Sequence, residues 1–257
     1  MIKKALNLPV AVITPDLASG QDFVRSLNSY ALAPTLFYYP FWPRVVNQKD
    51  KKNILNPAYK KIADKLAALI AEIITEHHFK YITLACNTLS LVSFINPTLE
   101  KLKAQGFVSG QDFQLVTTLQ LLRNMKQSTA GLFLGTTVLT KRLSKKYFQT
   151  LYTLDKAKLA ELVQEIIWRV KAIQGSDVST APQYSGELTD QAIFDQQLLL
   201  LAQELKKLKI STVILGCTEL PFAFERLTQL NPKLMFNLID PADLVGQALA
   251  KEYSFVR

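Results

Sequence analysis

The two cysteines of this 257-residue chain are the residues best suited to chemistry. Each follows an apolar, β-rich run that ends in a small residue: Ala85 precedes Cys86, and Gly216 precedes Cys217. Hydroxyl, amide or carboxyl side chains come next in both places, namely Asn87, Thr88, Thr218 and Glu219. An open α/β sheet places its reacting groups at the carboxyl ends of its strands. The duplication therefore predicts two similar halves that face one site with one thiol each.

A pair of thiols in this setting can move a proton. A cysteine thiol needs only a modest shift from its ordinary pKa of about 8.5 to be partly ionised near neutrality. The amides of a strand-to-helix turn favour an anion, and together with the neighbouring side chains they can hydrogen-bond a carboxylate. If one sulfur is a thiolate and the other a thiol, a proton can leave one face of a carbon and arrive on the other. The residues thus indicate racemisation by two bases, without a cofactor.

The elements that must position the cysteines follow a β-α-β pattern. Apolar runs with turn residues at their ends predict strands at 10–14, 35–39, 81–85, 114–117, 130–134, 212–215 and 236–239. Amphipathic spacing and helix-start signals predict helices at 21–31, 57–77, 97–105, 139–148, 156–173, 190–208 and from 242 onward, with Pro97 at the start of its helix. This alternation predicts parallel sheets with helices on both faces.

We therefore expect an α/β protein of two pseudo-symmetric domains, each with a mostly parallel sheet flanked by helices. The first domain is predicted to comprise residues 1–117 plus 238–257 and the second residues 118–237, with the active site in the cleft between them. Thr136 and Thr137 directly follow a strand at the site end of the second half, so we expect them to bind substrate.

The composition of the chain limits the classes of molecule that it is expected to bind. The net charge is +9, but the lysines are spread in pairs and form no basic stripe interleaved with aromatic residues, so we expect no nucleic acid partner. No apolar run approaches the roughly 20 residues of a membrane span. The run at 10–14 reads as the first strand rather than part of a leader, and the thiols read as free, so we expect a cytoplasmic protein. His77 and His78 have no acidic or cysteine partner at ligand spacing, and no metal site is predicted.

Both cysteine segments resemble the paired signatures of the cofactor-independent aspartate/glutamate racemase superfamily. The signatures lie at residues 85–88 (Ala-Cys-Asn-Thr) and 216–221 (Gly-Cys-Thr-Glu-Leu-Pro), with further matches at 134–137 and 239–241. The resemblance implies an amino-acid racemase that needs no pyridoxal phosphate or other cofactor. It also implies an acidic amino acid as substrate and a homodimer, since relatives are often dimers.

Two features favour aspartate over glutamate within that resemblance. Glu219 stands where aspartate racemases carry an acidic residue and glutamate racemases a histidine, and it is expected either to tune Cys217 or to contact the substrate amine. Residues 39–44 look like the aspartate racemase segment that presents an arginine, which implies that Arg44 holds the distal carboxylate. Lys171 offers a second positive charge.

The loop at residues 14–20 departs from the glycine-rich turn that is usual in the superfamily. This departure keeps two alternatives open. One is another two-cysteine enzyme, such as a maleate-type cis-trans isomerase. The other is a non-catalytic binding protein on the racemase scaffold.

Overall fold

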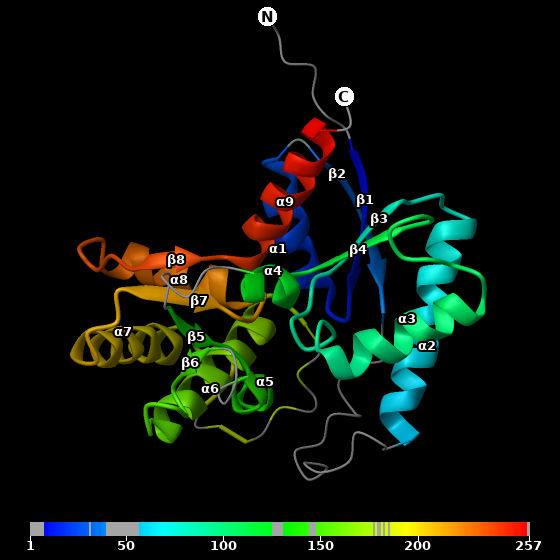
Figure 1. The fold of residues 1–257 in the computed structure, drawn as a ribbon. Helices are drawn as coiled ribbons and strands as arrows, with labels where there is room; N and C mark the ends of the chain where they lie inside the picture. The colour runs from blue at the N-terminus through cyan, green and yellow to red at the C-terminus, as the bar shows by residue number, and fades with distance from the viewer. Residues whose placement is uncertain are drawn as a thin grey trace, which may run out of the picture. The chain divides into compact units, whose positions relative to one another are not determined.

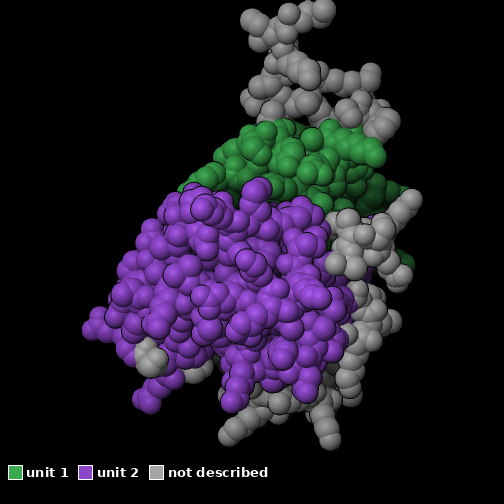
Figure 2. Space-filling model, turned by 90° about the vertical axis from the view of Figure 1, so that its left-hand side faces the viewer, with its two compact units in different colours: residues 1–122, 242–257 green, residues 123–241 purple. Residues whose placement is uncertain are grey.

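A computed structural model describes residues 8–30, 32–39, 57–124, 131–143, 148–176, 178, 181, 183–184 and 186–255. The chain divides into two compact units, coloured separately in Figure 2. Unit 1 comprises residues 1–122 and 242–257, and unit 2 comprises residues 123–241. Unit 1 is therefore built from both ends of the chain, and unit 2 is one continuous segment.

Unit 1 contains a parallel sheet with the strand order β2-β1-β3-β4. Its strands are β1 (Leu8–Thr14), β2 (Leu32–Tyr38), β3 (Tyr81–Leu84) and β4 (Gln114–Thr117). Its helices are α1 (Leu17–Asn28), α2 (Pro57–Thr75), α3 (Val92–Ala104), α4 (Thr118–Asn124) and α9 (Pro241–Phe255). Figure 1 shows α1 and α9 on one face of this sheet and α2 and α3 on the other.

The alternation of side chains along β1 explains this layering. Val10 and Val12 belong to a buried cluster that includes Phe23 of α1 and Val245 and Leu249 of α9. Ala11 and Ile13, which alternate with them along the strand, are also fully buried. Successive side chains of a strand point to opposite faces, so those neighbours are buried on the face that α2 and α3 cover.

Unit 2 repeats the plan with a parallel sheet in the order β6-β5-β7-β8. Its strands are β5 (Leu132–Leu134), β6 (Gln149–Thr150), β7 (Thr212–Leu215) and β8 (Asn237–Ile239). Its helices are α5 (Thr137–Leu143), α6 (Ala157–Ile173), α7 (Gln191–Lys207) and α8 (Leu220–Leu230). The main core of this unit joins Leu132, Leu134, Val213 and Leu215 to the apolar faces of α6, α7 and α8.

The predicted fold class is confirmed: two parallel four-stranded sheets, each flanked by helices, have the same strand order. Several details differ from the sequence-based prediction. Pro97 lies inside α3 rather than at its start. Helix α5 begins at Thr137 rather than Leu139, and residues 144–147 of the helix predicted at 139–148 lie outside the described residues. The short elements α4, β6 and α8 were not predicted. Among the described residues, no helix is long and apolar enough to cross a membrane.

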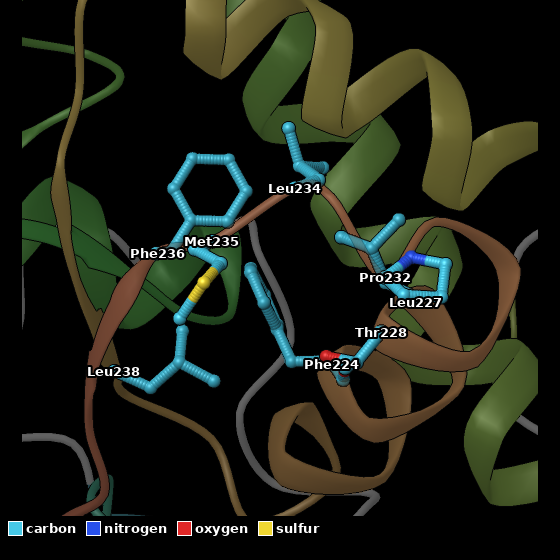
Figure 3. A pocket seen from close by; sticks show the side chains of 8 residues that line it. All are labelled: Phe224, Leu227, Thr228, Pro232, Leu234, Met235, Phe236 and Leu238. Atoms are coloured by element: carbon cyan, nitrogen blue, oxygen red, sulfur yellow. The ribbon is translucent and has the colours of Figure 1, made fainter.

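An apolar pocket lies beside α8 in unit 2, and none of its lining residues belongs to either cysteine motif (Figure 3). Its lining comprises Phe224, Leu227, Thr228, Pro232, Leu234, Met235, Phe236 and Leu238. None of these side chains titrates, so the pocket does not suit proton-transfer chemistry.

Candidate active site

Both cysteines lie at the topological switch point of their sheet, where the order of the strands reverses. In unit 1 the chain adds β2 on one side of β1 and β3 on the other, and in unit 2 it adds β6 and β7 on opposite sides of β5. Ligands of open α/β sheets bind at the carboxyl ends of the strands beside such switch points. Cys86 follows β3 and Cys217 follows β7, and both are partly exposed thiols that form no disulfide. The two thiols therefore occupy equivalent positions in their units.

The residue before each cysteine makes the same backbone contact. The amide of Ala85 donates to the carbonyl of Ile13 over 2.9 Å, and the amide of Gly216 donates to the carbonyl of Leu134 over 2.6 Å. Glycine at 216 has a steric cause as well. A Cβ there would lie 2.1 Å from the Phe133 ring and 2.4 Å from the Leu134 carbonyl oxygen. The small residue in this motif thus permits close packing of β5 against β7.

A hydrogen-bond network surrounds the turn that follows Cys86. The amide and the hydroxyl of Ser90 both donate to the Cys86 carbonyl, over 3.1 and 3.0 Å. The Thr118 hydroxyl, at the start of α4, donates to Oδ1 of Asn87 and lies 3.4 Å from the Ser90 hydroxyl. Asn87 and Thr88 are both buried. With its Oδ1 accepting this hydrogen bond, the Asn87 side chain retains its Nδ2 group as a hydrogen-bond donor.

The helix after Cys86 begins before the predicted position 97, but it does not follow the cysteine directly. A turn occupies residues 87–90, and α3 starts at Val92 with Leu91 as its N-cap residue. No side chain caps that helix, so Asn87 and Thr88 are not its capping residues. The amides near Cys86 belong to this turn rather than to the first turn of α3.

The Cys217 side chain has a buried carboxylate as its partner. The Cys217 Sγ donates to Oε2 of Glu219 over 2.8 Å, and the Thr218 hydroxyl lies 3.4 Å from the same oxygen. The other carboxylate oxygen, Oε1, lies 3.0 Å from Nζ of Lys171. The Glu219 side chain is only 2% exposed and that of Lys171 is 19% exposed. Glu219 thus bridges a thiol and an ammonium group.

Helix α6 supports both loops at the switch point of unit 2. Lys171 reaches Glu219 after β7, while Oε1 of Gln164 accepts from the backbone amide and the hydroxyl of Thr137 after β5, over 3.0 and 3.5 Å. Gln164 and Lys171 are seven residues apart, which places them on one face of a helix. The hydroxyl of Thr136 accepts from the Leu139 amide at the start of α5.

The buried Arg169 anchors α6 from another side. Its guanidinium pairs with Glu165 one turn earlier and donates to the Glu187 carbonyl over 2.7 Å. Tyr184 lies in the same connector between α6 and α7, and burial, reinforced by the charge of Glu165, raises its pKa to about 12. Glu187 is thus joined to α6, the helix that carries Lys171.

The unusual loop after β1 is short because α1 begins at Leu17. The Thr14 hydroxyl donates to the Asp16 carbonyl over 2.6 Å and accepts from the Asp16 amide. Gly20 lies within α1, and a Cβ there would be 2.6 Å from the Thr14 side chain and 2.8 Å from that of Leu36. The glycine of this segment therefore serves helix packing rather than a flexible turn.

The structure places the predicted site residues in two groups. Unit 1 brings together Cys86, Asn87 and Thr88. Unit 2 gathers Thr136 and Thr137 at one strand end, and Cys217, Thr218 and Glu219 at the neighbouring strand end. Arg44 lies outside the described residues. Among the described residues, no group of three or more His, Cys, Asp and Glu side chains could hold a metal ion.

Two supporting residues were missed from the sequence. Thr118 had a usable signal, because it directly follows a predicted strand and so stands at the same sheet edge as Cys86. Gln164 had no comparable signal, since nothing local in a helix indicates which loop it will meet.

Comparison with known proteins gives similarity in structure rather than in sequence. No family model and no curated protein matches the chain. A glutamate racemase from Francisella tularensis subsp. tularensis SCHU S4, solved with D-glutamate, matches with a TM-score of 0.53 at 16% identity, over 97% of this chain and 81% of that one. An aspartate racemase homologue from Pyrococcus horikoshii OT3 matches with a TM-score of 0.52 at 19% identity, over 96% and 99%. This chain has the aspartate/glutamate racemase fold.

The racemase fold is shared by proteins named for different substrates. An allantoin racemase from Klebsiella pneumoniae matches with a TM-score of 0.52 at 12% identity, over 97% of this chain and 89% of that one. Fold alone does not determine function, so the substrate has to be argued from the side chains of the site.

Proposed function

We propose that this chain racemises an acidic amino acid, aspartate in preference to glutamate, without pyridoxal phosphate. The observation that carries the proposal is the equivalent placement of Cys86 and Cys217 at the switch points of two sheets with the same strand order. In the proposed site the two units face each other across a cleft, with one sulfur on each side of the substrate Cα.

The reaction needs only proton transfers. A thiolate removes the Cα proton, and the thiol on the opposite face delivers its proton to the resulting carbanion. The two cysteines exchange roles when the other enantiomer is bound. The negative charge that develops on the substrate carboxylate is stabilised by hydrogen-bond donors fixed before the reaction. For this we propose the turn amides together with Asn87, Thr88, Thr136, Thr137 and Thr218.

The preference for an acidic side chain rests on charge. Arg44 is proposed to hold the distal carboxylate, since a guanidinium binds a carboxylate through two hydrogen bonds. The net charge of +9 favours the approach of an anionic substrate such as aspartate, whose two carboxylates outweigh its single ammonium group. We further propose that the protein is a cytoplasmic homodimer.

Exchange of the Cα proton with solvent tests this function. We would incubate the protein with L- and D-aspartate and L- and D-glutamate in D2O and follow the Cα signal by NMR. We expect deuterium uptake by aspartate, faster than by glutamate, and a loss of about 100-fold or more in Cys86→Ala and in Cys217→Ala.

Two outcomes would replace the proposal. Turnover of maleate or a similar unsaturated diacid, with no Cα exchange, would indicate a cis-trans isomerase in which one cysteine attacks the double bond. Binding of an amino acid that survives both cysteine substitutions, without any turnover, would indicate a binding protein.

A further inference from the structure

A chain of contacts links the side chains of Cys217, Glu219 and Lys171, with the buried Glu219 at its centre. Sγ of Cys217 is 2.8 Å from one oxygen of Glu219, and Nζ of Lys171 is 3.0 Å from the other. Three elements contribute: Cys217 follows β7, Glu219 is the N-cap residue of α8, and Lys171 comes from the last turn of α6. Glu219 makes no side-chain capping bond to α8, and its carboxylate contacts both the thiol and the ammonium group.

The pair of Cys217 and Glu219 holds one proton, and ordinary acidities place it on the sulfur. A carboxyl group is a stronger acid than a thiol by about four pH units. A carboxylate in contact with the thiol then opposes its ionisation, because a thiolate there would face a like charge. Lys171 supplies the opposite charge that makes a buried, ionised Glu219 tolerable.

We propose that Glu219 keeps Cys217 protonated in the resting protein and that Lys171 is the positioning residue that keeps Glu219 ionised and directed at the thiol. Given the proposed racemase function, on which this assignment rests, Cys217 is the acid that first delivers a proton to Cα and Cys86 is the base that removes one. Glu219 is a catalytic residue in that scheme because it touches the reacting sulfur.

Lys171 also has a role after the proton has left. Once Cys217 has given its proton to the carbanion, a thiolate and a carboxylate lie side by side. The nearby ammonium group lowers the free energy of that state. The pair regains its proton from the next substrate, or from water, and the S–H bond is restored without any other reactant.

The test reads the ionisation of Cys217 directly and uses no substrate. The chain has two cysteines, so in a Cys86→Ser background the remaining thiol is Cys217. We would measure its alkylation by iodoacetamide across pH by intact mass, since the thiolate is the reacting form. The pH midpoint of alkylation reports loss of the shared proton.

The two charge-removing variants should move that midpoint in opposite directions. We expect Glu219→Gln to lower it by about one pH unit or more, because the carboxylate is gone. We expect Lys171→Met to raise it by a similar amount, because the positive charge is gone. Lys171→Arg should restore the midpoint, and Lys158→Met, an equivalent change at an exposed position of α6, should leave it unchanged.

The proposal would be overturned if the alkylation midpoint did not change in Glu219→Gln. It would also be overturned if the midpoint shifted in the same direction in Glu219→Gln and Lys171→Met. If Lys171→Met fails to fold, as judged by circular dichroism, the double variant Glu219→Gln/Lys171→Met replaces it and should react at higher pH than Glu219→Gln alone. Failure of racemase activity leaves the alkylation result intact, so the two proposals are separable.

Discussion

At the scale of single residues, the contacts of the Cys217 thiol bear on where a proton rests. The Cys217 sulfur contacts a carboxylate that is paired with a lysine. A two-base racemase needs one thiol and one thiolate at any moment. The carboxylate contact supplies a physical reason for the proton to rest on Cys217.

Thr118→Val tests whether the Asn87 side chain is held by its neighbour. Valine keeps the shape of threonine but leaves Oδ1 of the buried Asn87 without that donor. We expect a loss of about 1–3 kcal/mol in the free energy of unfolding. We also expect the rate of Cα exchange to fall by about tenfold or more, because Asn87 is free to turn its Nδ2 group away from the substrate. Urea denaturation and the NMR exchange assay measure these two effects.

Thr98→Val is the matched control for Thr118→Val. Thr98 is also fully buried in unit 1, but its hydroxyl donates to the Phe94 carbonyl within α3. We expect it to reduce stability and leave the exchange rate per folded molecule unchanged. Equal loss of exchange in both variants would contradict a positioning role for Thr118.

At the scale of elements, most strands and the longest helices were predictable from the sequence, and their contacts were not. Periodic apolar residues and end signals placed β3 and β7, and hence both cysteines at strand ends. The pairing of Glu219 with Lys171, and of Gln164 with Thr137, joins residues far apart in the chain. Local pattern carries no information about such partners. Pro97 is a local signal that misplaced a boundary, because its helix begins at Val92 rather than at the proline.

The α7–α8 contact predicts a pH dependence of stability. Arg226 donates from Nε and Nη2 to the two oxygens of Asp195, over 2.9 and 2.6 Å. The hydrogen bonds from Arg226, aided by one from Gln191, hold the pKa of Asp195 below its ordinary value. Because the pKa of Asp195 is lower in the folded than in the unfolded state, its ionisation stabilises the fold. That contribution to the free energy of unfolding is complete above the unfolded pKa of about 3.9 and is lost as the pH falls through the folded pKa.

Asp195→Asn therefore changes the acid side of the stability curve. We expect the variant to have a lower melting temperature than wild type at pH 7. Near pH 3 the difference in melting temperature between the two proteins should be smaller. The control is Glu204→Gln on the same helix, which removes a partner of the exposed Lys207 and should alter melting little. A gap that stays constant or widens from pH 7 to pH 3 would contradict the assignment.

At the scale of the whole molecule, the last helix completes the first unit. Val245 and Leu249 of α9 lie in the same buried cluster as Val10 and Val12 of β1. Polar contacts reinforce this packing, since Gln114 at the start of β4 donates to both carboxylate oxygens of Glu252 over 2.8 and 2.7 Å. The unit that carries Cys86 therefore requires the end of the chain, whereas the unit that carries Cys217 is continuous.

Leu249→Ala tests that dependence. Leu249 is 1% exposed, and deleting a buried leucine side chain costs about 2–5 kcal/mol. We expect amide hydrogen exchange, measured by mass spectrometry of peptides, to accelerate in β1 and β3 and to stay slow in β7 and α7. Gln247→Ala, at an exposed position of the same helix, should change neither. Equal acceleration in both units would show that they unfold as one body, because a cavity in the α9 cluster removes contacts from unit 1 alone.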